Sequence, residues 1–174
     1  MARHRAHLIG LLMSLLVVGI GGAAYGQTSV HNAAVDWIED VQGWMNDRFD
    51  PLYVEIGARA LWSALPDEVI RGPDIVSDFD VDYHLATEDF LDLIDQYFAD
   101  DSPIRRLVSS RDDRSRYLAS AMEAYQKSLF AQHNLLRSIA DGSATVREIE
   151  YWYQIGGLWE SIGKLNMLLY TGSR

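Results

Sequence analysis

The stretch LASAMEAYQKSLFAQHNLLRSI, residues 118–139, decides the class of fold. Mostly apolar residues recur along it at alternating steps of four and three residues: Leu118, Met122, Tyr125, Leu129, Gln132, Leu136 and Ile139. This spacing places the side chains on one face of an α-helix and is typical of a seam between packed helices. Gly142 follows at a position where a helix C-terminus favours glycine. We therefore predict a long helix here that packs against other helices.

The next segment, from Thr145 to about Tyr170, predicts a second long helix with a broad apolar surface. It opens with Thr145 and Glu148, which are spaced as a capping box. A stripe of apolar side chains, widened by two tryptophans, then follows: Tyr151, Ile155, Leu158, Ile162, Leu165 and Leu169, with Trp152 and Trp159. Gly156 and Gly163 would let another backbone approach closely. Helices that are apolar all round are usually buried, so one interpretation makes this the central helix of a bundle, and the other is that part of its surface docks a partner or a membrane.

Upstream of residue 118 the pattern predicts three further helices. They are expected over 30–48, over 51–65 with a new start at Asp50-Pro51, and over 87–99 with Thr87 as its cap. The last of these would turn five side chains inward: Phe90, Leu91, Ile94, Tyr97 and Phe98. Residues 66–86 lack a helical period, and polar and apolar residues alternate through the Asp-rich run 78–83, as in an extended segment. The predicted fold is therefore all-α, an irregular bundle of about five helices.

The first 26 residues combine Arg3 and Arg5 with an uncharged apolar run over 8–25 and small residues before Gln27. This pattern is typical of a secretory signal peptide cleaved between Gly26 and Gln27, and the apolar run is also long enough to remain as a membrane anchor. Either interpretation exports residues 27–174, because the arginines hold the N-terminus on the cytoplasmic side. We therefore expect one acidic helical domain over 27–174 with an irregular segment 66–86. Its location would be periplasmic or otherwise extracytoplasmic, with an anchor in the inner membrane if the leader is retained.

The composition narrows the classes of function. The chain has 25 acidic and 15 basic side chains, and its net charge of −10 repels the phosphate backbone of nucleic acids. It has no cysteine, which excludes zinc–thiolate sites, thiol nucleophiles and iron–sulfur clusters. Stability must then come from core packing, which the 48% hydrophobic content permits. We expect no nucleic-acid partner and no cofactor.

Candidate chemistry is confined to the Asp-rich run. Asp78, Asp80 and Asp82 stand at the first, third and fifth positions of a stretch that partly fits a calcium-binding loop. Tyr83 stands at the sixth position, where such a loop requires glycine. His84 beside these carboxylates would complete a site for metal or acid–base chemistry. Carboxylate-rich loops are commonly just solvated, so a solvated segment is the favoured interpretation and a calcium site the alternative. Ser161 and Lys164 match a Ser-x-x-Lys pattern, but its companion elements are missing, so we expect no enzyme activity.

The broad apolar surface of the last predicted helix carries the functional hypothesis. We expect a non-catalytic exported protein that acts as an interaction or accessory subunit of a cell-envelope or membrane complex, with other envelope or membrane proteins as partners. The residues expected to bind the partner are Tyr151, Trp152, Gly156, Trp159 and Gly163. An alternative is a periplasmic binding module that holds an apolar small molecule or lipid, with Trp152, Trp159 and Tyr125 as walls. A metal-dependent hydrolase that uses the Asp-rich run and His84 is the third hypothesis.

Overall fold

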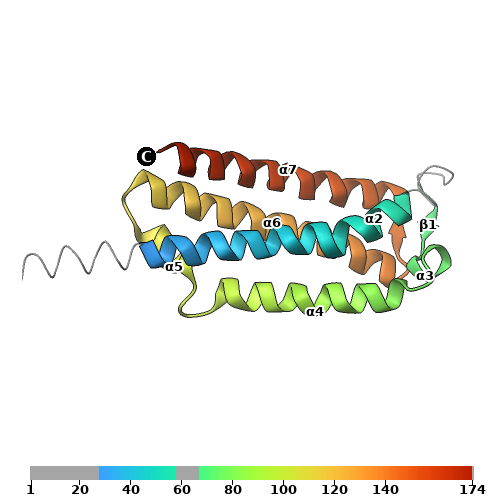
Figure 1. Cartoon of the computed structure of the whole chain (residues 1–174). Helices are drawn as coiled ribbons and strands as arrows, with labels where there is room; N and C mark the ends of the chain where they lie inside the picture. Colours follow the sequence, from blue (N-terminus) through green and yellow to red (C-terminus); the bar gives the residue numbers. More distant parts are fainter. Residues whose placement is uncertain (1–27, 58–66, 174) are drawn as a thin grey trace, which may run out of the picture.

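A computed structural model describes residues 28–57 and 67–173 of the chain (Figure 1). It begins with an N-terminal helix over 28–44. The elements that follow are η1 (Met45–Phe49), α2 (Asp50–Ile56), β1 (Val69–Ile70), α3 (Gly72–Ile75), α4 (Phe79–Phe98), α5 (Pro103–Ser109), α6 (Asp113–Ala140), β2 (Ala144–Thr145) and α7 (Val146–Gly172). The two strands are only two residues long each, so the predicted all-α bundle is confirmed.

The predicted leader, residues 1–26, lies outside the described residues, as does the end of the helix predicted over 51–65. Within 28–57 and 67–173, no helix combines the length and the apolar character needed to cross a membrane.

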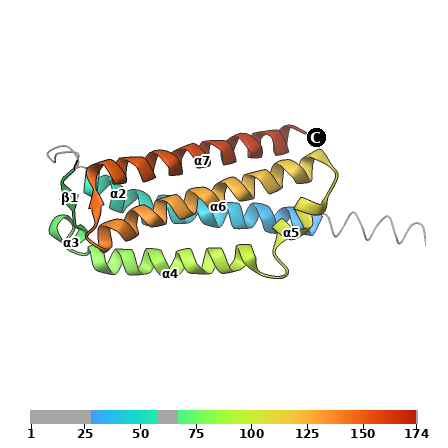
Figure 2. The ribbon, with the colours of Figure 1, turned by 180° about the vertical axis from the view of Figure 1, so that it is seen from behind.

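The central helix of the bundle is α6. Figures 1 and 2 show it between α7 on one side and α4 on the other, with the helix over 28–56 beside it. Fifteen residues of α6 are buried, compared with five of α7. Of the two interpretations of the last helix, the one that makes it the central helix of the bundle is therefore wrong. Helix α7 packs mainly on α6 and leaves much of its surface facing outward.

The helix does not restart at Asp50-Pro51, contrary to the prediction. Phe49 and Asp50 both keep right-handed helical dihedral angles, and the amide of Asp50 donates to the carbonyl of Met45, five residues back. Pro51 has no amide hydrogen, and in an ordinary helix its ring would crowd the carbonyl four residues back. The wider π-helical turn η1 accommodates the proline, so the chain continues as one helix from residue 28 to α2.

Helix α4 begins at Phe79, whereas the prediction placed the start at Thr87. Phe79 is fully buried against Gly72, where a Cβ would collide with its ring, and Val81 is 61% exposed. The buried and half-buried positions step by four and three from the first residue of the helix: Phe79, Tyr83, Ala86, Phe90, Leu93 and Tyr97. The predicted extended segment over 78–83 is wrong. Its three aspartates stand at every second position, which imitates the period of a strand, although the segment enters a helix.

The predicted inward face of this helix is also partly wrong. Phe90 and Tyr97 are buried as predicted and Ile94 is half-buried, but Leu91 and Phe98 are 52% and 58% exposed. Because the helix begins at Phe79, its buried stripe runs through Phe90, Leu93 and Tyr97. Leu91 and Phe98 lie beside that stripe.

The junction between α6 and α7 has the helix end and the helix cap that the sequence predicts. Gly142 has φ of 63° and ends α6. The hydroxyl of Thr145 accepts from the Glu148 amide at 3.3 Å, and the Glu148 carboxylate accepts from the Thr145 amide at 2.9 Å, which confirms the predicted capping box. Strands β1 and β2 pair antiparallel, with Val69 opposite Thr145. These contacts fix the start of α7, which then runs antiparallel along α6 (Figures 1 and 2).

Candidate interaction surface

The two glycines predicted to bind a partner instead form the contact between α6 and α7. The hydroxyl of Ser128 on α6 donates to the carbonyl of Gly156 at 2.8 Å. A Cβ on Gly156 would lie 2.9 Å from Cγ of Gln132, and one on Gly163 would lie 2.8 Å from two ring carbons of Tyr125. Both glycines are buried. The sequence correctly indicated a close backbone approach, but the approaching element is a helix of the same chain.

The opposite side of α7 carries an exposed apolar face, which we call the outer seam. Its members are the stripe recognised in the sequence: Tyr151, Ile155, Leu158, Ile162, Leu165 and Leu169. Tyr151, Leu158 and Leu165 are 55%, 55% and 57% exposed, and the two isoleucines are half-buried. Leu158 stands two residues after Gly156, which corresponds to about 200° around a helix of 3.6 residues per turn. The outer seam therefore faces away from α6.

The tryptophans predicted as binding residues mark the boundary between the two sides of α7. Trp152 is half-buried and packs against the core, with Tyr151 edge-on to it at a centroid distance of 5.3 Å. Trp159 is half-buried, and the ammonium of Lys127 on α6 lies 4.4 Å from its ring centroid. Of the five predicted binding residues, Tyr151 belongs to the outer seam, the tryptophans flank it, and the glycines lie on the inner side.

The outer seam carries no charge. Between Tyr151 and Leu169 the only charged side chains are Glu160 and Lys164, which bridge each other at 2.5 Å. The hydrogen bond that Lys164 donates to the Glu160 carboxylate raises the pKa of Lys164. The pair faces the N-terminal part of the bundle, because Lys164 lines a groove together with Ile38 and Gln42.

An apolar groove of about 330 Å³ lies beside the outer seam. Helix 28–44 forms one wall with Ile38 and Gln42, and α7 forms the other with Met167 and Leu168. Tyr125 of α6 lies at the base, where its hydroxyl accepts from Gln42 Nε2 at 2.5 Å. Of the three wall residues predicted for an apolar ligand, Tyr125 lines this groove, whereas Trp152 and Trp159 do not.

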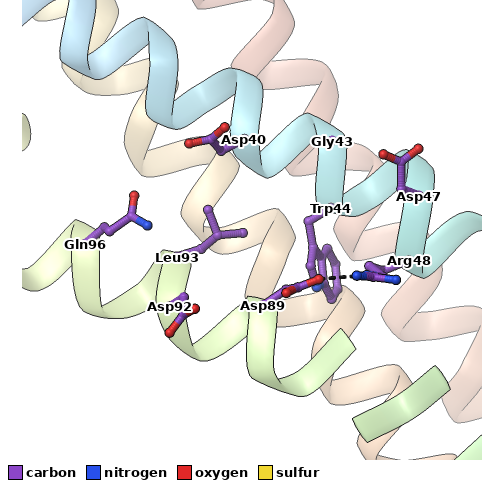
Figure 3. A pocket seen from close by; sticks show the side chains of 9 residues that line it. All are labelled: Asp40, Gly43, Trp44, Asp47, Arg48, Asp89, Asp92, Leu93 and Gln96. Atoms are coloured by element: carbon purple, nitrogen blue, oxygen red, sulfur yellow. Dashed lines mark hydrogen bonds and ion pairs between the residues drawn. The ribbon is translucent and has the colours of Figure 1, made fainter. Parts of the chain in front are cut away.

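A second groove, of about 420 Å³, lies between helix 28–44, η1 and α4 (Figure 3). Asp40, Asp47, Asp89 and Asp92 line it, and Arg48 donates to the Asp89 carboxylate at 2.7 Å. Trp44 closes its inner side by donating to the carbonyl of Ala86 at 2.8 Å. Sequence reasoning missed this groove because its carboxylates come from helices far apart in the chain, and nothing in their local spacing indicates that they meet.

The Asp-rich run does not form the predicted calcium loop. Asp78 precedes α4, and Asp80 and Asp82 stand exposed in its first turn. A calcium loop needs a backbone that folds around the ion, which a helix cannot supply. His84 is exposed and pairs with Glu88 at 3.2 Å. Within residues 28–57 and 67–173, no three histidine or acidic side chains converge as a metal site would require.

Two buried histidines lie at helix contacts of the bundle. His133 of α6 is 8% exposed, stacks on Phe90 at a centroid distance of 3.9 Å, and lies 3.3 Å from the Thr87 hydroxyl. Burial, assisted by the charge of Arg137, lowers the pKa of His133 to about 4. Burial also lowers the pKa of His31, whose Nε2 lies 2.9 Å from the Ser115 hydroxyl. Both imidazoles are therefore neutral parts of the core at neutral pH.

In comparisons with known proteins, no family model, no curated protein and no solved structure matches this chain.

Proposed function

We propose that this protein is a non-catalytic helical interaction protein, and that it binds its partner through the outer seam of α7. The observation that carries the proposal is the exposure of Leu158 and Leu165, which are 55% and 57% accessible in the middle of a charge-free face. Contiguous apolar patches on soluble proteins mark interaction sites when they extend beyond a few hundred Å². Tyr151, Trp152 and Trp159 supply the aromatic side chains that commonly anchor protein interfaces.

Covering the outer seam would stabilise a complex. Burial of apolar surface contributes about 25 cal/mol per Å². Because the backbone of α7 is already fixed against α6, little backbone entropy remains to be lost on binding. The capping box and the glycine contacts with α6 thus hold α7 in the position in which the outer seam is exposed.

The site of action is part of the same proposal. The basic and apolar pattern of residues 1–26 supports export, and the partner is then another protein of the cell envelope or its membrane. The protein would act there as an accessory subunit, in the periplasm or tethered to the inner membrane by a retained leader.

Native mass spectrometry of the full chain, extracted mildly from the cells that produce it, tests the proposal. We expect an assembly heavier than one chain of 19.7 kDa. The double variant Leu158→Asp, Leu165→Asp should release a single folded chain, because burying two carboxylates in an apolar contact is prohibitive. Leu91→Asp, at a site on α4 that is 52% exposed, is the matched control and should leave the assembly intact. A wild-type chain that is single at all concentrations would refute the proposal.

The apolar groove supports a second candidate function, the binding of a small apolar molecule or lipid. Ile38, Tyr125, Met167 and Leu168 supply it with apolar side chains that suit an alkyl chain. Calorimetric titration of the full chain with palmitate should then give a saturable heat that Leu168→Asp abolishes and Leu91→Asp preserves. Absence of saturable heat with the wild type would remove this candidate.

A further inference from the structure

The outer seam has the register of a two-stranded coiled coil. Written as a heptad, its positions alternate between a, occupied by Ile155, Ile162 and Leu169, and d, occupied by Tyr151, Leu158 and Leu165. In parallel coiled coils, β-branched residues at a combined with leucine at d favour two strands over three or four. The central layers of the outer seam follow this rule without exception.

The positions that flank the a and d residues carry no charges that would select a different protein as the partner. The e positions hold Trp152, Trp159 and Asn166, and the g positions hold Gln154, Ser161 and Leu168. Coiled coils between different chains are usually selected by opposite charges at e and g. An uncharged face requires a partner face that is equally uncharged, and the same face of a second copy meets this requirement.

Electrostatics also argue against a lipid surface as the occupant. Amphipathic helices that lie on membranes carry lysine and arginine around the apolar face to bind anionic lipids. Lys164 is the only basic residue between Tyr151 and Leu169, and Glu160 neutralises it.

The course of the chain favours a parallel arrangement. His31, near the start of helix 28–44, contacts Tyr170, near the end of α7, with ring centroids 5.7 Å apart. The start of helix 28–44 therefore lies at the C-terminal end of α7 (Figure 1). Parallel pairing of two copies brings the starts of both N-terminal helices to the same end of the dimer, as two retained leaders in one membrane would require, whereas antiparallel pairing sends them to opposite ends.

We infer that the outer seam binds the outer seam of a second copy, so that two α7 helices pair in parallel about a two-fold axis. This inference rests on the proposed function and names the partner. The seam from Tyr151 to Leu169 spans about 27 Å at 1.5 Å per residue, long enough for several interlocking layers. Helix α4 lies on the far side of α6 from α7, so it does not obstruct the approach (Figures 1 and 2).

Single cysteines test this arrangement, because the chain contains no other thiol. In a parallel dimer each d residue faces its own copy, at a spacing that a disulfide can bridge. We expect Tyr151→Cys and Leu165→Cys, each in the full chain, to form a covalent species of twice 19.7 kDa on mild oxidation. Leu91→Cys, similarly exposed on α4, should remain a single chain.

The two cysteine sites separate parallel from antiparallel pairing. In an antiparallel pair, a residue faces the same residue of the other copy only near the centre of the contact. Two cysteine sites fourteen residues apart therefore cannot both form a disulfide with the same site of the second copy. Failure of either site to self-link, or equal linkage at Leu91→Cys, would overturn the inference. A heavy assembly in native mass spectrometry without self-linkage would leave the proposed function standing with a different partner, whereas a single chain in both experiments would refute both.

Discussion

Helices α6 and α7 are nearly equal in length, at 28 and 27 residues, and they pack against each other, yet they are buried to very different extents. α7 carries the broader apolar surface in the sequence and buries five residues, whereas α6 buries fifteen. Many of the buried positions of α6 hold small side chains: Ser115, Ala119, Ala121, Ala124, Ser128 and Ala131. Small residues let several neighbouring helices approach at once, so they suit a central position better than bulky apolar residues do.

The comparison shows that apolar character alone does not decide which helix is central. A helix with bulky side chains on two faces can bury one face within its own chain and present the other to a partner. The rule that an all-round apolar helix is buried still applies to α7 if the paired state is the functional one.

The largest expected difference between the two helices concerns leucine truncation. Leu129→Ala on α6 removes a fully buried side chain and should lower the free energy of unfolding by about 2–5 kcal/mol. Leu158→Ala on α7 should change it by less than about 0.5 kcal/mol in the single chain, because this side chain is already exposed. Urea unfolding at several protein concentrations checks both. The cost of Leu158→Ala should rise with concentration if α7 is paired, and equal costs at high dilution would contradict the comparison.

Acid should lower the free energy of unfolding through the buried His133 of α6. The pKa of His133 is about 4 in the folded chain, below the ordinary value of about 6.5 expected after unfolding. Between these two values the unfolded state binds the extra proton, so stability falls as the pH decreases. One pKa unit corresponds to about 1.4 kcal/mol, which gives a loss of about 2 kcal/mol between pH 7 and pH 5.

His133→Gln isolates this contribution from those of other groups, including His31. The variant should be less stable at pH 7 but should lose less stability between pH 7 and pH 5, as measured by urea unfolding at each pH. Identical pH dependence in the wild type and the variant would show that His133 does not titrate as its burial requires.

The smallest expected effect distinguishes the two sides of α7. Gly163→Ala places a Cβ 2.8 Å from the buried ring of Tyr125. Overpacking of about 1–3 kcal/mol should outweigh the gain of about 1 kcal/mol in helix propensity, for a net loss of about 1 kcal/mol. Gly157→Ala meets nothing within 4 Å and should instead stabilise the chain by up to about 1 kcal/mol. Thermal unfolding of the two variants should therefore shift in opposite directions, and a stabilised Gly163→Ala would contradict the close α6–α7 contact.

Local signals in the sequence predicted much of the fold. The seam over 118–139, the end of α6 at Gly142 and the capping box at Thr145 all appear as expected. Predictions went wrong where a local signal is overruled by its surroundings. Pro51 predicted a new helix, but a π-helical turn accommodates it within a continuing one.

The candidate site was predicted in part. The stripe from Tyr151 to Leu169 was recognised as apolar, and its exposure was left open between two interpretations. Gly156 and Gly163 were assigned to a partner, but Gln132 and Tyr125 of the same chain fill the space beside them. The acidic groove around Arg48 and Asp89 had no signal in the sequence, since its residues meet only when helix 28–44 and α4 lie side by side.

The sequence by itself determined the class of fold and the helix boundaries at Gly142 and Thr145, because helical periodicity, caps and glycine conformation depend on interactions among residues a few positions apart. Only the tertiary structure decided which helix is central and which face of α7 remains outward. Both faces of α7 are apolar enough to be buried, so the choice depends on how the small residues and Tyr125 of α6 fit against Gly156 and Gly163. Such a fit is a property of two surfaces together, and neither helix encodes it alone.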